Sequence, residues 1–140
     1  KKTMKILKTT LFISVMLLLV NCTTVVEGTS DFHPDFKVGK TGFEKELKKQ
    51  LDFDDLAIGT YYTKKNNSLE EKGLNLTFEF AEQELPNKEE LNNDAEFIIT
   101  KVKEYLLNLD NYDYVNIIFE NGREEGNIAK SSRIKIKKEL

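Results

Sequence analysis

The sequence predicts an α+β fold, a two-layer sandwich in which two helices cover one face of an antiparallel sheet of about four strands, in the order α-β-β-α-β-β. A long apolar stripe recurs every three and four residues between Leu91 and Leu109, as in an amphipathic helix. In "LNLTFEF", residues 74–80, apolar and polar side chains alternate strictly, as in a half-buried strand. One apolar face per element implies two layers around one core.

The first half of the predicted domain is a helix followed by a hairpin. Thr41 and Glu44 have the spacing of a capping box, so we expect a helix over residues 41–52. Its apolar stripe has members at intervals of four: Phe43, Leu47 and Leu51. Residues 56–64, "LAIGTYYTK", are rich in strand formers and are joined to residues 74–80 by a polar connection. This arrangement predicts an antiparallel hairpin.

The second half repeats the same order of elements without visible sequence repetition. Asn87 and Glu90 again have capping-box spacing, and they open a predicted helix of about 22 residues. Residues 114–120, "YVNIIFE", predict a strand, and residues 127–140 supply a last strand. Asn121-Gly122 between them is a hairpin-turn signal.

The amino terminus has a different composition from the rest of the chain. Residues 1–8 are basic, and residues 9–20 form an apolar run that ends at polar Asn21. A membrane-spanning helix needs about 20 apolar residues, so this run is too short to span. A basic stretch followed by a short apolar run is instead the pattern of a secretory signal peptide.

The end of the apolar run, "LVNC", resembles the lipobox of bacterial lipoproteins, with Leu19 three positions before Cys22. The resemblance implies that residues 1–21 are a removed signal peptide and that Cys22 carries the lipid (palmitate among its acyl chains). Residues 22–40 would then be the lipidated cysteine and a flexible tether, and residues 41–140 a single α+β domain. The resemblance also implies a cell-envelope location, at the outer membrane if the host is Gram-negative, because Thr23 is not an inner-membrane retention signal.

The charge balance argues against a nucleic-acid partner. Four of the 21 basic residues precede Cys22 and no acidic residue does, which leaves 17 against 24 and a net charge of −7 for the mature chain. A nucleic-acid binder usually carries the opposite sign.

Residues for catalysis or cofactor binding are scarce. The chain has one cysteine and one histidine, His33, so nucleophilic triads and structural zinc sites lack their parts. The acidic clusters at 52–55 and 110–113 lack the spacing of a calcium-binding loop and are interpreted as turn formers or surface charges. We therefore expect no catalytic residues, no metal site and no cofactor.

Four tyrosines are the candidate partner-binding residues, because aromatic side chains on a sheet surface can hold a peptide, glycan or protein: Tyr61, Tyr62, Tyr112 and Tyr114. The competing interpretation is that they are half-buried strand residues. The favoured hypothesis is a lipid-anchored, non-catalytic binding module that contacts the membrane through its anchor and an envelope protein or peptide through its domain. The alternatives are a carboxylate- or metal-dependent envelope hydrolase and a structural envelope component.

Overall fold

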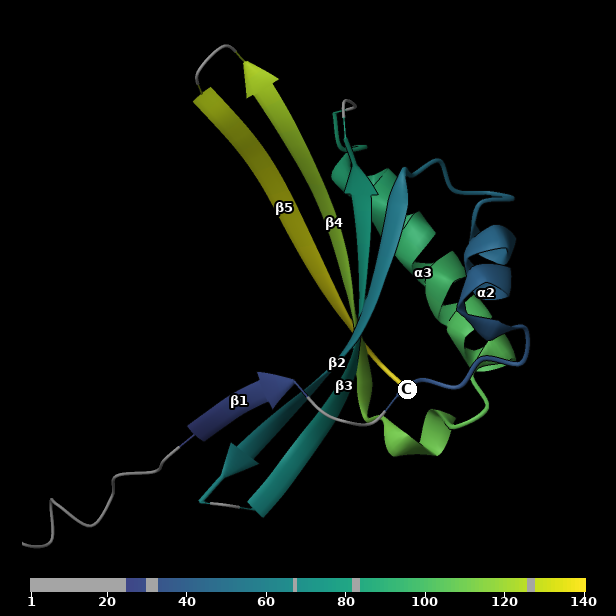
Figure 1. Cartoon of the computed structure of the whole chain (residues 1–140), viewed down its shortest axis with the longest axis vertical. Coiled ribbons are helices and arrows are strands. Elements are labelled where there is room, and N and C mark those ends of the chain that lie inside the picture. The colour runs from purple at the N-terminus through teal and green to yellow at the C-terminus, as the bar shows by residue number, and fades with distance from the viewer. Residues whose placement is uncertain (1–24, 30–32, 67, 82–83, 126–127) are drawn as a thin grey trace, which may run out of the picture.

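The chain forms one mixed five-stranded sheet with two helices packed on one side of it (Figure 1). The computed structural model describes residues 25–29, 33–66, 68–81, 84–125 and 128–140. The predicted signal peptide and Cys22 lie outside these described residues. The α+β class is confirmed, whereas the predicted sheet of about four antiparallel strands is wrong in strand number and in direction.

The helices differ in how closely they follow the prediction. Helix α3 (Lys88–Tyr105) begins with the predicted capping box, in which Asn87 accepts from the backbone N–H groups of Glu89 and Glu90. Helix α2 (Gly39–Leu47) begins two residues before Thr41, and its N-cap residue, Val38, makes no side-chain capping bond. The capping box expected at Thr41 is therefore wrong. Gly39 has φ 67°, a left-handed conformation that favours glycine, and it lets the chain turn into the helix early.

The sheet consists of β1 (Val25–Thr29), β2 (Asp55–Lys65), β3 (Ser68–Phe80), β4 (Tyr114–Glu125) and β5 (Ile128–Glu139), which lie side by side in that order. All neighbours are antiparallel except β3 and β4, which run parallel. The parallel pair arises because α3 carries the chain from the end of β3 back to the start of β4. The element order is thus β-α-β-β-α-β-β.

Three differences from the predicted boundaries change the shape of the sheet. Strand β1 occupies part of the segment that we predicted to be a flexible tether, and it pairs with the last residues of β2. Strand β3 begins at Ser68, inside the predicted polar connection. The Asn121-Gly122 pair lies within β4 rather than at a turn. As a result, the β2–β3 and β4–β5 hairpins extend past one another in opposite directions (Figure 1).

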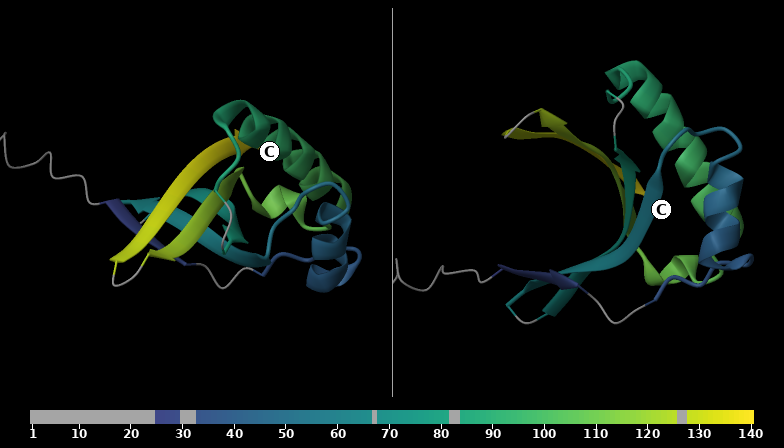
Figure 2. Two further views of the ribbon diagram at one scale, coloured as in Figure 1. Left: turned by 90° about the horizontal axis from the view of Figure 1, so that it is seen from above. Right: turned by 45° about the horizontal axis from the view of Figure 1, so that its top comes forward.

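The hydrophobic core lies between the helices and one face of the sheet. Its fully buried side chains come from both helices and from β2, β3 and β4: Phe43, Leu47, Leu56, Leu74, Leu76, Phe78, Leu91, Ile98, Val102, Val115, Ile117 and Phe119. Figure 2 shows that the sheet curves, with both helices on its convex side. Neither of the helices in the described residues covers the concave side, which we call the open face.

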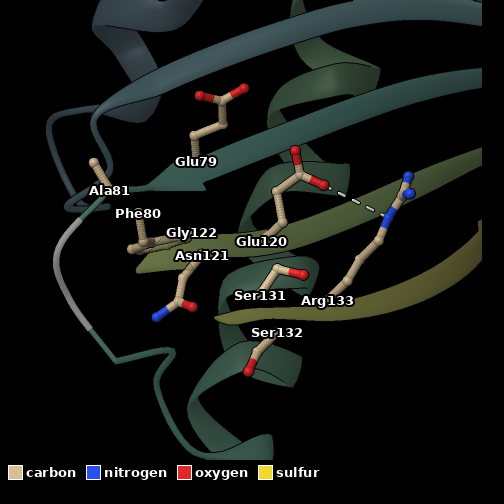
Figure 3. Close-up of a pocket in the computed structure, with 9 residues that line it drawn as sticks. All are labelled: Glu79, Phe80, Ala81, Glu120, Asn121, Gly122, Ser131, Ser132 and Arg133. Carbon is tan, nitrogen blue, oxygen red and sulfur yellow. Dashed lines mark ion pairs between the residues drawn. The ribbon is translucent and has the colours of Figure 1, made fainter. Parts of the chain in front are cut away.

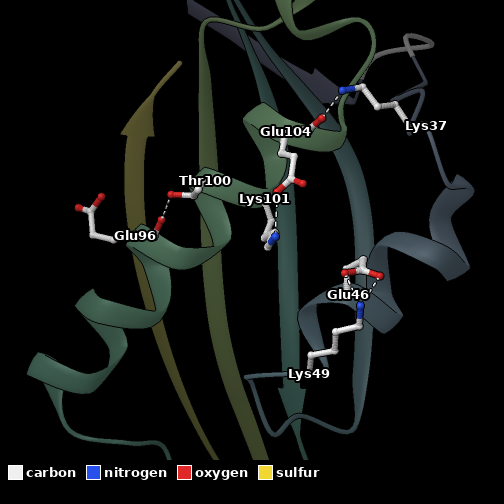
Figure 4. A network of polar contacts seen from close by, with 7 residues as sticks. All are labelled: Lys37, Glu46, Lys49, Glu96, Thr100, Lys101 and Glu104. Atoms are coloured by element: carbon white, nitrogen blue, oxygen red, sulfur yellow. Dashed lines mark hydrogen bonds and ion pairs between the residues drawn. The ribbon is translucent and has the colours of Figure 1, made fainter.

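The outer surface of the helices is a solvated, charged surface (Figure 4). Lys49, in the turn after α2, pairs with Glu46 at 2.7 Å, and Lys101 pairs with Glu104 at 2.8 Å within α3. Exposed pairs of this kind stabilise a helix by about 0.3–0.5 kcal/mol. Since ordinary helix energetics explains this network, we do not interpret it as a binding site.

Candidate functional site

The open face is built from every second residue of the strands, because side chains alternate across a sheet. The strand register aligns these residues into rows that cross β2, β3, β4 and β5. From the start of β2 towards its end, the rows are Asp55–Glu79–Glu120–Arg133, Ala57–Thr77–Ile118–Lys135, Gly59–Asn75–Asn116–Lys137 and Tyr61–Gly73–Tyr114–Glu139. The two middle rows have small side chains on β2 and β3.

One end of the open face is closed by an interlocked cluster around Tyr114. This tyrosine is only 3% exposed, although α2 and α3 both lie on the other side of the sheet. Its ring lies over Gly73 of β3, where any side chain would overlap ring atoms. Lys137 of β5 places its Nζ 4.0 Å from the ring centroid and pairs with Glu71 at 3.3 Å. Burial, together with the charge of Glu71, raises the pKa of Tyr114.

Tyr61 of β2 belongs to the same end of the open face. Its hydroxyl donates a hydrogen bond to the Glu27 carboxylate of β1, and this bond raises the pKa of Tyr61 to about 12. Side chains from all five strands therefore meet in this cluster. The hydrogen bond between Tyr61 and Glu27 helps to fix the register of β1, in addition to the backbone pairing of β1 with β2.

The raised pKa of Tyr61 predicts a loss of stability in alkali. A folded-state pKa of about 12 against an ordinary 10 means that the folded state holds this proton more tightly. The contribution should be complete below pH 10 and should disappear as the pH rises from 10 to about 12. Ultraviolet titration should show one tyrosine that ionises last. In Tyr61→Phe that late step should be missing, and its persistence would contradict the assignment.

The centre of the open face holds a polar pair, in which Asn116 is buried and Asn75 is half-buried. Asn116 is 2% exposed, and its Nδ2 donates to Asn75 Oδ1 at 2.8 Å. Asn116 Oδ1 has no hydrogen-bond partner among the described residues. A buried amide oxygen without a partner costs about 1–3 kcal/mol, so this acceptor is an unsatisfied position on the open face.

The far end of the open face is acidic. Asp55, Glu79 and Glu120 lie in register on three neighbouring strands, and like charges placed side by side destabilise a sheet. Glu120 is 3.6 Å from Arg133 in an ion pair, whereas Asp55 and Glu79 form none among the described residues. No group of three potential metal-ligating His, Cys, Asp or Glu side chains occurs in the described part of the chain.

A pocket of about 480 Å³ adjoins this acidic row, where β3 ends and β4 and β5 continue (Figure 3). Glu79, Glu120 and Ser131 project to the same side in Figure 3, whereas Asn121 and Ser132 project to the other. A smaller pocket of about 140 Å³ lies in the core between Leu51, Phe78 and Phe119, with Asp94 at its edge. Burial, with a smaller effect from Glu90, raises the pKa of Asp94.

The four candidate tyrosines do not form one surface. Tyr61 and Tyr114 meet on the open face, as described above. Tyr62 points to the opposite face, where its ring lies against Gly28. Tyr112 is 5% exposed and belongs to the core, and burial raises its pKa. Periodicity alone could have separated Tyr61 from Tyr62, since neighbouring strand residues face opposite sides. It could not have separated Tyr112 from Tyr114, because Tyr112 precedes the first residue of β4 by two positions.

The remaining sequence candidates have structural contacts. The Asp54 carboxylate accepts from the backbone N–H of Ala81, and the Asp113 carboxylate accepts from that of Lys72. His33 is exposed, and its carbonyl accepts from Asn108 Nδ2. Asn75 and Asn116 are not among the residues that we predicted from the sequence. Their signal was a polar residue at the same position in two strands that pair with each other, which requires knowing that β3 and β4 are neighbours.

Comparisons with protein-family models, curated proteins and solved structures find no match to this chain. In the part of the chain that the structure describes, no helix combines the length and the apolar character needed to cross a membrane.

Proposed function

We propose that the protein is a lipid-anchored binding module of the bacterial cell envelope and that its open face holds an extended, basic polypeptide segment of a partner protein. The observation that carries this proposal is the acidic row of Asp55, Glu79 and Glu120, which lies on a sheet face that none of the described helices covers.

Charge complementarity supports a basic partner. Asp55 and Glu79 have no ion-pair partner among the described residues, although both lie at the acidic end of the face. A lysine or arginine laid across this row would relieve the repulsion between the neighbouring carboxylates. The small side chains of Ala57 and Gly59 leave room for a segment, and no atom lies within 4 Å of the space above Gly59.

Peptide binding to the full chain tests the open face. We expect an octapeptide of alternating lysine and threonine to bind and its glutamate–threonine counterpart not to bind. Glu79→Gln should weaken the basic peptide by about two- to fivefold at low salt, the range of one exposed charge pair. Glu89→Gln, an exposed acid at the start of α3, is the matched control and should leave binding unchanged. Equal binding of both peptides would refute the proposed partner.

The anchor has its own test. In a producing bacterium, Cys22→Ala should abolish labelling by a radioactive fatty acid and move the protein out of the membrane fraction. Thr23→Ala, one residue further on, should change neither. If Cys22→Ala still labels and remains in the membrane, the proposed anchor is wrong, while the peptide-binding result stands separately.

A further inference from the structure

The exposed apolar side chains of the protein are concentrated at one end of the sheet. Of the six large hydrophobic residues that are exposed among those described, three lie there: Val25 at 55%, Val26 at 43% and Leu69 at 45%. The register places them in two neighbouring rows, Val25–Lys65–Ser68 and Val26–Lys64–Leu69. Because neighbouring rows face opposite sides of the sheet, these side chains surround the end of the sheet on both faces. We call Val25, Val26, Lys64, Lys65 and Leu69 the hairpin-tip patch.

The hairpin-tip patch combines apolar and cationic side chains without an acid in its two rows. Lys64 and Lys65 are its charged members, and the nearest carboxylates are those of Glu27, Glu70 and Glu71. Two of these carboxylates have other partners: Glu27 accepts a hydrogen bond from the Tyr61 hydroxyl, and Glu71 forms an ion pair with Lys137. Apolar residues flanked by lysines are the chemistry of a surface that lies in the headgroup region of an anionic bilayer.

The position of the patch in the chain indicates the same partner. Only Thr23 and Thr24 separate Cys22 from Val25, the first residue of β1. Three residues of extended chain span at most about 11 Å, so a lipid on Cys22 would hold this end of the sheet at the bilayer surface. Of the 18 residues that we predicted to be a tether, only these two therefore lie between Cys22 and the first strand.

We infer that the hairpin-tip patch is a second membrane contact, which docks the end of β1, β2 and β3 on an anionic lipid surface beside the anchor. This inference rests on the proposed lipidation of Cys22. This contact would fix how the sheet is oriented relative to the bilayer. Asp55 lies ten residues along β2 from Lys65, so the acidic row would stand about 33 Å from the bilayer contact. That distance exceeds the Debye length of about 8 Å in physiological salt, which keeps the acidic row clear of anionic headgroups.

Figure 1 shows the same separation along the molecule. The patch lies where β1 runs beside the end of the β2–β3 hairpin, and the free end of the β4–β5 hairpin lies at the opposite end of the sheet. The pocket beside the acidic row is at that distant end. Docking of the hairpin tip would therefore present the pocket and the acidic part of the open face to a partner away from the membrane.

A tryptophan probe tests the contact, because the chain contains no tryptophan. Leu69→Trp is compared with Leu107→Trp, which replaces a residue that is 58% exposed in the turn after α3, outside the patch. The full chain is attached at Cys22, its only cysteine, to vesicles of phosphatidylcholine and phosphatidylglycerol with brominated acyl chains. The attachment is the natural lipid or, if Cys22 proves not to be lipidated, a maleimide lipid coupled to the same residue.

We expect bromine to quench the Leu69→Trp emission about twofold and to leave the Leu107→Trp emission nearly unchanged. Lys64→Gln together with Lys65→Gln should reduce the quenching, as should vesicles without phosphatidylglycerol. Equal quenching of both probes, or none in either, overturns the inference. So does a blue shift of Leu69→Trp that rises with protein density on unbrominated vesicles, because that result indicates pairing between two copies. Since the anchor can be supplied chemically, failure of the patch and failure of natural lipidation are distinguishable.

Discussion

Replacing Gly73 by alanine should lower the free energy of unfolding by about 1–3 kcal/mol, the usual cost of overpacking a filled site. Gly73 is buried on β3, and a Cβ at this position would overlap the ring of Tyr114. The ring cannot swing aside freely, because Tyr114 is 3% exposed and Lys137 packs on it. Urea unfolding followed by circular dichroism measures the change.

Two further variants show whether the ring is the cause. Gly59→Ala, on the neighbouring strand and the same face, meets no atom within 4 Å, so it should be neutral or should stabilise by about 0.5–1 kcal/mol. Tyr114→Ser removes the ring, and in that background Gly73→Ala should cost far less than in the parent chain. An additive double-mutant cycle would show that the two residues do not interact.

The elements that could be predicted from the sequence are those whose signal is local. The capping box at Asn87 and the apolar stripe of α3 need only neighbours along the chain, and both predict the helix at its observed start. The alternation in residues 74–80 likewise predicts the buried side of β3. Local signals were weaker at α2, where the positive φ of Gly39 starts the helix before Thr41.

The sheet topology could not be predicted because pairing is a long-range property. Nothing in residues 74–80 or 114–120 alone says that β3 and β4 lie side by side and parallel, which depends on how α3 crosses the sheet. β1 has only five residues, in a segment with loop-forming Gly28, and it is a strand because the free edge of β2 accepts it. The parallel pairing of β3 with β4 and the pairing of β1 with β2 are therefore both determined by the arrangement of the complete sheet.

The candidate site depends on the same long-range pairing. Tyr61 and Tyr114 were named from composition, but their meeting across Gly73 requires the register of three strands. Nothing in the sequence singles out Asn75 and Asn116, and their hydrogen bond becomes visible only when β3 and β4 are placed side by side. The acidic row has the same origin, since Asp55, Glu79 and Glu120 come from three separate segments.

Phe119→Ala should be the most destabilising single change, with a loss of about 3–5 kcal/mol in the free energy of unfolding. Phe119 of β4 is 1% exposed, and its ring lies 5.6 Å from that of Phe78 and 6.4 Å from that of Phe80, both on β3. These ring contacts join the two helix–hairpin halves across the parallel pair, where the hairpins overlap.

Phe119 also lines the pocket of about 140 Å³, so removing its ring would enlarge an existing space and add to the loss. Phe97→Ala, which removes a half-buried ring at the edge of the core, should cost clearly less. Urea unfolding with an unchanged denaturant slope would show that stability alone has changed. If Phe119→Ala cost no more than Phe97→Ala, the two halves would be held together chiefly by the backbone ladder between β3 and β4, and the aromatic contacts across it would contribute little.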